Sequence, residues 1–248
     1  MAKFGWKQFV PVYFFTSVSL ILVTTAFLLT EISLMKALIL TVAGFISWSF
    51  VEYVLHRFIF HYEAKAKWAK KLIYRMHLEH HDYPKEIDQL FSGLGTSIPI
   101  ASLYYLLVLF FVGYNGAAFM FTGLIIGYFL YEFLHYSAHH RAPKMRFLQY
   151  LKRYHMLHHH LEANMRYGVT SPVIDYLFGT FGPAVRKRDA LMMAPKLASK
   201  VAVKVAAKVA NKLELGSEMA SEIAAELTKE LKSELEKSGV AAKTLTNS

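Results

Sequence analysis

The residues with the clearest capacity for chemistry are the histidines, because all twelve fall between positions 56 and 160. They form four groups, which read HRFIFH, HLEHH, HYSAHH and YHMLHHH in chain order. Residues three and four positions apart share one face of a helix, so most of these groups direct several imidazoles the same way. Neutral imidazole is a good ligand for zinc, iron, copper and nickel. The pattern predicts a metal site rather than twelve separately satisfied histidines.

The number of histidines indicates two metal ions, because one four-coordinate site uses about four ligands. The chain has no cysteine, which excludes disulfides and thiolate ligands. Three carboxylates, Glu52, Glu132 and Asp175, are candidates for orienting the imidazoles through their second ring nitrogen. Glu52 lies four residues before His56, and Glu132 lies three before His135. Each acid taken alone could instead lie at a membrane interface or pair with a nearby arginine.

Long apolar segments must position these histidines. Residues 8–30 form an uncharged run that exceeds the roughly 20 residues needed to cross a bilayer as a helix. Residues 37–55 carry one acid, and residues 89–131 carry no charge and contain the turn signal GYNG. These lengths disfavour buried helices of a large soluble protein. We expect an all-α integral membrane protein with four transmembrane helices in two hairpins, at about residues 8–30, 35–55, 91–112 and 116–137.

The positive charges orient this bundle. Lysine and arginine precede the first expected span and follow the second and fourth, whereas the two short connections carry almost none. By the positive-inside rule, we expect both termini and the active site on the cytoplasmic side of the membrane. That membrane would be a bacterial inner membrane or the endoplasmic reticulum. His135 would lie at the cytoplasmic end of the fourth span, and the other histidines in a cytoplasmic helical cap formed by residues 56–90 and 138–189. The net charge of +10 needs no nucleic-acid partner, because these basic residues flank membrane spans.

The composition divides the chain into two expected domains. Residues 1–189 form the membrane domain, and residues 190–248 form a tail rich in alanine, lysine and glutamate. Apolar residues recur every four positions in the tail, first among lysines and then, after Gly216 and Ser217, among glutamates. We expect a basic and an acidic amphipathic helix, which pair with each other or bind lipid, or else a loosely helical solvated tail.

The histidine groups and their surroundings resemble the fatty acid hydroxylase superfamily, which includes sterol desaturase-like membrane oxygenases. The resemblance is carried by EYVLHRFIFH, HLEHHDYP and GYFLYEFLHYSAHH, and above all by LKRYHMLHHHLEANMRYGVTSPVIDYLFGT. It covers residues 40–182 and is strongest to the fatty acid and sphingolipid 2-hydroxylases. The first span only matches the architecture of that family, and the tail lies outside the resemblance.

The resemblance implies a dimetal centre with two iron ions, dioxygen as oxidant and an external electron donor, with zinc able to occupy the site in purified protein. The ligands that it implies are His56, His61, His77, His80, His81, His135, His139, His155, His158 and His159. His140 matches only some members and ranks below these ligands, and His160 is expected to be a nonligand. No histidine remains for a haem domain, so we expect a separate donor of the cytochrome-b or ferredoxin type.

The implied function is that of a membrane-bound non-haem di-iron monooxygenase. It would insert a hydroxyl group into an unactivated C–H bond of a lipid acyl chain, at C2 of a fatty acid or sphingolipid acyl group. Hydroxylation or desaturation of a sterol or carotenoid is the first alternative. A metal transporter or metal-binding membrane protein is a more remote one, because transport sites usually lie near the bilayer midplane.

Overall fold

The computed structural model describes residues 6–183 and 217–237, and every regular element in those ranges is a helix. The chain divides into two compact units, Met1–Phe181 and Gly182–Ser248. In the second unit the structure describes α10 (Ser217–Lys237), which covers the predicted acidic helix of the tail. The predicted basic helix lies outside the described residues. The mostly helical architecture agrees with the predicted fold class.

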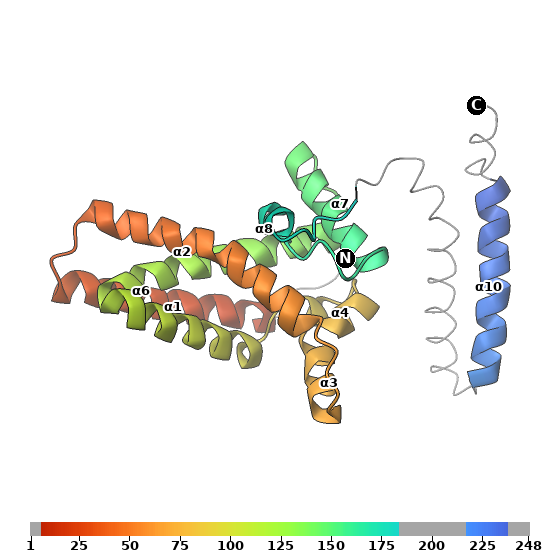
Figure 1. Ribbon diagram of the computed structural model, residues 1–248, viewed down its shortest axis with the longest axis horizontal. Helices are drawn as coiled ribbons and strands as arrows, with labels where there is room; N and C mark the ends of the chain where they lie inside the picture. Colours follow the sequence, from red (N-terminus) through yellow and green to blue (C-terminus); the bar gives the residue numbers. More distant parts are fainter. Residues whose placement is uncertain (1–5, 184–216, 238–248) are drawn as a thin grey trace. The chain divides into compact units, whose positions relative to one another are not determined.

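Two long helices begin the first unit, and each packs against α6 (Leu94–His140), the long helix that follows (Figure 1). A short 3-10 turn, η1 (Trp6–Phe9), leads into α1 (Val10–Leu29), and α2 (Leu34–Val54) follows after a short connection. The side chain of Ser33 accepts a hydrogen bond from the backbone N–H of Lys36, which caps the start of α2. Both helices lie close to the bounds predicted from the apolar runs.

The next long element, α6 (Leu94–His140), reverses direction at Gly113, whose φ is 71° and ψ is 177°. Glycine adopts this conformation at the least steric cost. Tyr105 and Phe121 lie on opposite sides of the break, and their ring centroids are 5.6 Å apart. In a straight helix, residues so far apart in sequence would be separated by about 24 Å. The two halves of α6 therefore pack against each other as a hairpin (Figure 1).

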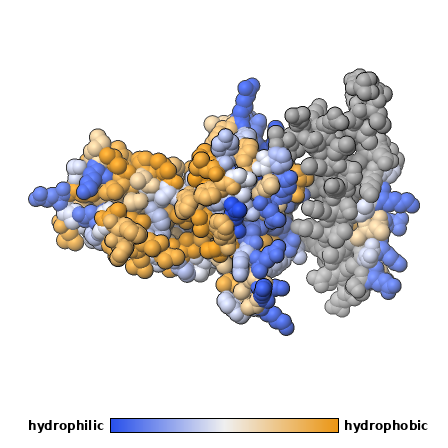
Figure 2. Space-filling model, viewed as in Figure 1, coloured by the Kyte–Doolittle hydropathy of each residue, from blue (hydrophilic) through white to orange (hydrophobic). Residues whose placement is uncertain are grey.

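Three segments of the described residues are long and apolar enough to cross a membrane: Lys7–Leu29, Leu34–Phe60 and Ile87–His140. The sequence predicts four separate crossings, and the difference arises because the 54-residue third segment contains both halves of α6. Apolar side chains cover the surface of the long helices, while polar ones gather toward the end where the short helices lie (Figure 2). This composition is that of a multi-pass membrane protein.

Glycines allow α2 and the second half of α6 to approach closely. A β-carbon added to Gly123 would lie 1.9 Å from the carbonyl oxygen of Thr41, and one added to Gly44 would lie 2.0 Å from that of Met120. Small residues commonly permit such contacts between membrane helices. The glycine contacts therefore fix the relative position of two elements whose ends carry histidines.

The remaining helices of the first unit are short and gather at one end of the long helices (Figure 1). In chain order they are η2 (Leu55–Phe60), α3 (Lys67–Ile73), η3 (Tyr74–Leu78), α4 (Glu79–Asp82), α5 (Ile87–Leu90), α7 (Arg146–His160) and α8 (Val173–Leu177). We call this assembly the cap. Both η2 and η3 are π-helical turns, which are rare and frequently accompany functional sites.

Candidate metal centre

Ten histidines gather into two groups in the first unit. The ring nitrogens that they offer lie within 4.8 Å of one another in each group. The first group is His56, His61, His77, His81 and His158, and the second group is His80, His135, His139, His155 and His159. The rings of His81 and His159 stack across the two groups, with centroids 4.0 Å apart. The four sequence groups therefore converge on two adjacent imidazole clusters.

Helical periodicity explains how neighbouring histidines are divided between the groups. His77 and His81 lie one turn apart and enter the first group, whereas His80 enters the second. In α7 the assignment is reversed, because His155 and His159 enter the second group and the histidine before His159 enters the first. The segments η3–α4 and α7 therefore each supply ligand candidates to both groups.

The spacing of five residues between His56 and His61 has a different cause. In an α-helix two such side chains would point about 140° apart. Here the π-helical turn η2 closes with a hydrogen bond from the N–H of His61 to the carbonyl of His56, at 3.2 Å. The two rings come to 5.1 Å between centroids. The wider turn thus brings both imidazoles into the first group.

The donor chemistry of the two groups fits a metal ion in each. Nε2 of His139 lies 3.0 Å from that of His80 and 2.9 Å from that of His155. Within the described part of the chain, Nε2 of His56 and both ring nitrogens of His135 are buried without a hydrogen-bond partner. Such atoms are rare in folded proteins. A cation would satisfy them, and an all-imidazole set suits iron, zinc, copper or nickel.

Burial keeps the imidazoles of the cap neutral. Loss of hydration lowers the pKa of His61 and of His80 to about 4, and that of His158 to about 3. The same cause, followed by the charges of neighbouring histidines, lowers the pKa of His77 and of His155 well below 6.5. A histidine must be deprotonated to bind a metal. The cap therefore presents histidines in the binding form at neutral pH.

Two histidines lie outside both groups. His140 stacks on Tyr136, with ring centroids 5.0 Å apart and 17° between the planes. His160, at the end of α7, has its ring centroid 6.1 Å from that of His159. Every predicted ligand except the lower-ranked His140 thus lies in one of the two groups. His160, which was expected to be a nonligand, lies in neither.

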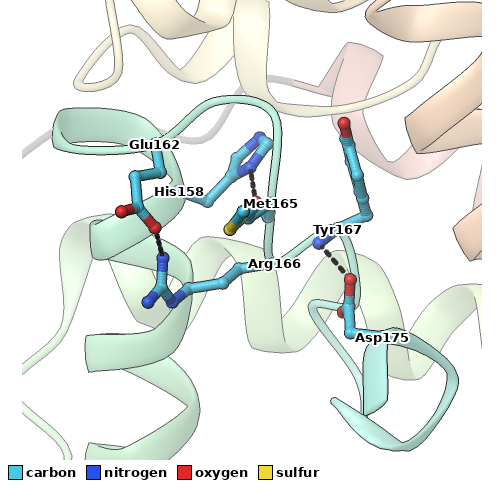
Figure 3. A network of polar contacts seen from close by, with 6 residues as sticks. All are labelled: His158, Glu162, Met165, Arg166, Tyr167 and Asp175. Atoms are coloured by element: carbon cyan, nitrogen blue, oxygen red, sulfur yellow. Dashed lines mark hydrogen bonds and ion pairs between the residues drawn. The ribbon is translucent and has the colours of Figure 1, made fainter. Parts of the chain in front are cut away.

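Backbone carbonyls brace the first group. Nδ1 of His56 lies 2.5 Å from the carbonyl oxygen of Tyr167. Nδ1 of His158 lies 2.7 Å from that of Met165, as Figure 3 shows. An imidazole that donates from Nδ1 to a carbonyl has a fixed tautomer and leaves Nε2 for a metal. Sequence reasoning missed these partners, because a backbone carbonyl has no residue type to signal it.

Asp175, on α8, holds the segment that carries these carbonyls. Its buried carboxylate accepts hydrogen bonds from the backbone N–H of Tyr167 at 2.9 Å and of Gly168 at 2.7 Å (Figure 3). The Tyr167 carbonyl in turn accepts from His56. The sequence predicts that Asp175 orients an imidazole, and the structure places one residue of backbone between the two.

Arg166 forms the bend of the same segment. Its φ is 63°, in the left-handed region that non-glycine residues rarely adopt. Its N–H donates to the carbonyl of Thr180 at 2.8 Å, and its buried guanidinium pairs with Glu162 (Figure 3). These contacts fix the direction in which the Met165 and Tyr167 carbonyls point.

Glu52 and Glu132 bind backbone groups as well. Glu52 is buried near the end of α2 and accepts hydrogen bonds from the backbone N–H of Val169 and of Thr170, and from the Thr170 hydroxyl. It therefore braces the same segment as Asp175. Glu132 accepts from the backbone N–H of Ser92 through Oε1, at 3.0 Å. The sequence made Glu132 a candidate for orienting the imidazole of His135. In the structure, the hydrogen bond from Ser92 instead turns Oε1 of Glu132 toward the segment just before α6.

A narrow apolar cavity lies between α1, α2 and α6 and extends to His56 of the first group. Phe15, Trp48 and Leu124 form part of its wall, and His56 lines it. A small polar hollow borders His77 and His135. The two spaces share Phe60, Ser92, Thr96 and Tyr131. A long apolar molecule in the cavity would therefore have its polar end close to both histidine groups.

Comparison with known proteins identifies the family. The sequence profile described as fatty acid hydroxylase matches residues 41–180. A dihydroceramide fatty acyl 2-hydroxylase of Arabidopsis thaliana is 36% identical over 138 residues, which are 55% of this chain and 58% of that protein. The mouse fatty acid 2-hydroxylase is 34% identical over 148 residues, 58% of this chain and 40% of that protein. The chain thus covers less than two thirds of the length of these relatives.

A solved structure shares the fold. Full-length scs7p, of which only the hydroxylase domain is visible, aligns with a TM-score of 0.65 and 27% sequence identity, over 71% of this chain and 67% of that one. The family profile covers more than half of this chain and includes all twelve histidines and the three carboxylates discussed above. The chain belongs to the fatty acid hydroxylase family.

Proposed function

We propose that this protein hydroxylates C2 of a lipid acyl chain, with two iron ions and dioxygen. The observation that carries the proposal is the pair of five-histidine groups at the end of an apolar cavity. The names of the plant and mouse relatives refer to 2-hydroxylation of fatty acyl groups, which favours an acyl chain over a sterol or carotenoid.

The reaction needs redox chemistry, because replacing C–H by C–OH is a two-electron oxidation that side-chain acids and bases cannot supply. Iron supplies the activation of dioxygen when bound. One oxygen atom enters the C–H bond and the other leaves as water, which consumes two electrons and two protons. The first group would hold one ion and the second group the other, and zinc can replace iron in purified protein. The electrons would come from a separate protein of the cytochrome-b or ferredoxin type.

The chain's own contribution is to position the substrate and to exclude water. Aromatic and aliphatic walls of the cavity would hold the hydrocarbon chain in one direction. The polar hollow beside Ser92 and Thr96 would take the acyl carbonyl. Because C2 is bonded to that carbonyl carbon, it would lie at the boundary of the two spaces, nearest His56 and His135. Such positioning supplies much of the selectivity for one carbon.

The proposal extends to topology. The two halves of α6 would cross the membrane separately, which gives four crossings with α1 and α2. The basic residues of the cap would place the histidines, and both termini, in the cytoplasm of a bacterium or on the cytoplasmic side of the endoplasmic reticulum. Residues 1–189 would be the hydroxylase domain, with residues 190–248 as an appended helical tail.

Mass spectrometry of the lipids of cells that express the full chain with an electron donor tests this function. We expect 2-hydroxyacyl lipids with the unchanged protein and with His160→Ala, which alters a histidine outside both groups. We expect none with His158→Ala, which removes a member of the first group. Equal amounts of 2-hydroxyacyl lipid with His158→Ala would overturn the proposal. Metal uptake without any oxidised lipid would instead support the transport alternative.

A further inference from the structure

The short helix α8 and the residue that follows it carry large apolar side chains on their outer surface. Each of these side chains is more than half exposed: Val173, Tyr176, Leu177 and Phe178. We call them the α8 patch. Between residues 171 and 180 the only charged residue is Asp175, which is fully buried. Contiguous apolar surface of this kind marks contact with another protein or with a membrane.

The position of the α8 patch favours a membrane. Helix α8 packs against α2 near the cap (Figure 1). The ring of Phe178 stacks on that of Tyr53, with centroids 5.2 Å apart, and lies 6.5 Å from that of Phe50. Phe50 is exposed and belongs to the segment Leu34–Phe60, which is long and apolar enough to cross a membrane. The α8 patch therefore continues the exposed apolar surface of α2.

The length of α2 gives the depth of this contact. A helix that enters the hydrocarbon at Leu34 crosses its thickness of about 30 Å after about 20 residues, which is close to Tyr53. Helix α8 thus lies where hydrocarbon meets the lipid headgroups. Tyrosine is enriched at this level, because its ring is apolar and its hydroxyl is polar. Helices at this depth bury an apolar face in the lipid and keep their polar side away from it.

The inner side of α8 reaches the first histidine group. Asp175 accepts hydrogen bonds from the backbone N–H of Tyr167 and of Gly168, and the Tyr167 carbonyl lies against Nδ1 of His56. One short helix therefore has lipid-compatible side chains on its outside and the brace of the first group on its inside. We propose that α8 is an interfacial anchor. The α8 patch inserts into the leaflet on the cap side of the membrane, and the lipid thereby keeps Asp175 in its bracing position.

Depth-dependent fluorescence quenching tests the anchor. The chain has no cysteine, so a single introduced cysteine carries the only label. The full-length Leu177→Cys protein is labelled with a small fluorophore and placed in phosphatidylcholine vesicles. One vesicle sample contains lipid with a nitroxide near the headgroup end of its acyl chain, and another receives aqueous iodide. We expect the nitroxide to lower the emission about twofold or more, because an inserted side chain meets the lipid directly.

Two matched labels calibrate the result. Ile46→Cys, at an exposed position of the α2 span, should be quenched by the nitroxide, and Arg153→Cys, at an exposed charged position of α7, by iodide. Tyr176→Cys repeats the measurement if Leu177→Cys does not fold. Nitroxide quenching at the α8 patch no stronger than at Arg153→Cys would overturn the anchor. Strong iodide quenching would then mean that the patch faces water, and protection from iodide would mean that protein, such as a second copy of the chain, covers it.

Competitive metal titration in the same vesicles tests the link to the first group. Leu177→Asp places a charge in the α8 patch and leaves Asp175 unchanged. We expect the metal affinity of the first group to fall about threefold to tenfold, less than the 10–100-fold typical of losing a direct partner of a ligand. The affinity of the second group should not change. Equal loss at both groups, or no loss, would overturn the link.

Met145→Asp is the matched control for this titration. It makes a comparable change at an exposed apolar residue just before α7, and should leave both affinities unchanged. Neither quenching nor metal binding requires dioxygen or a substrate. The anchor is therefore supported or rejected independently of the reaction proposed above.

Discussion

The two histidine groups differ in what holds their rings. In the first group, Nδ1 of His56 and of His158 each meets a backbone carbonyl. In the second, Nδ1 of His80, of His135 and of His155 has no hydrogen-bond partner within the described ranges. The first group is therefore braced by a polar segment, whereas the second depends on the packing of the helices that carry it.

This difference means that the groups respond to different parts of the chain. The bracing segment is held by the buried carboxylates Glu52 and Asp175, which lie outside both groups. The second group draws two histidines from the end of α6, which packs against α2 through Gly44 and Gly123. Substitutions can therefore weaken one group and leave the other intact.

The largest effect should follow from removing one ligand candidate of each group in turn. His56→Ala and His135→Ala should each lower the metal content of the purified protein from two ions per chain to one. Hydroxylation should fall by more than about 100-fold in both, since replacing a second-sphere partner alone costs 10–100-fold. Elemental analysis and product assays measure these effects. Loss of both ions from either variant would show that the groups do not fill independently.

Acid should destabilise the metal-free protein through both groups. The folded pKa is about 4 for His61, about 3 for His158 and about 4 for His80, against 6.5 for free histidine. The unfolded chain thus binds more protons as the pH falls from 6.5 toward 4, and stability is full above this range. In this range each of the three histidines lowers the free energy of unfolding by up to about 1.4 kcal/mol for every unit by which the pH falls. Thermal unfolding in detergent should show a lower Tm at pH 5 than at pH 7, and an unchanged Tm would contradict the burial of these imidazoles.

Asp175→Asn should affect the first group selectively. The amide nitrogen of asparagine would face a backbone N–H, so either Tyr167 or Gly168 would lose its acceptor, at a cost of about 1–3 kcal/mol in stability. The Tyr167 carbonyl would then hold His56 less firmly. Metal affinity at the first group should fall about 10–100-fold. Competitive metal titration should show one weakened ion and one unchanged ion, and equal weakening of both would reject the bracing role.

Glu52→Gln should have a smaller effect on the same group. An amide oxygen can still accept from the N–H of Val169 and of Thr170, and the Thr170 hydroxyl can rotate to accept from the amide nitrogen. We expect a loss of metal affinity of only about threefold to tenfold, which is below that for Asp175→Asn. The same titration ranks the two variants. A larger loss with Glu52→Gln would mean that the carboxylate charge, rather than its hydrogen bonds, supports the first group.

Residue types and their periodicity predict much of this molecule. Long apolar runs with few charges locate α1, α2 and α6, because a helix that crosses a bilayer needs about 20 apolar residues. The GYNG signal lies where α6 reverses, because a glycine is needed for the positive φ of Gly113. Histidine spacing likewise predicts the residues that converge, although their division into two groups depends on tertiary packing.

Three features could not be read from the sequence. The π-helical turn that aligns His56 with His61 depends on packing at the end of α2, and no residue type requires it. The carbonyls of Met165 and Tyr167 carry no signal, since every residue has one. The expected pairing of Glu52 with His56 followed from their distance of one helical turn, but neighbours on a helix need not bond when a backbone segment offers better-placed donors.

The smallest effect should come from His140, which tests where the second group ends. Its partly buried ring stacks on Tyr136 rather than on a member of either group, so His140→Ala removes an aromatic contact and no member of a group. We expect two metal ions per chain and activity within about twofold of the unchanged protein, because all five histidines of each group remain. His139→Ala, one position earlier, is the matched control and should lose the ion of the second group. Loss of an ion from His140→Ala would instead make His140 a sixth member of the second group. Its ring would then have to leave Tyr136 when the metal binds, so the second group, unlike the braced first group, would include a ligand that moves.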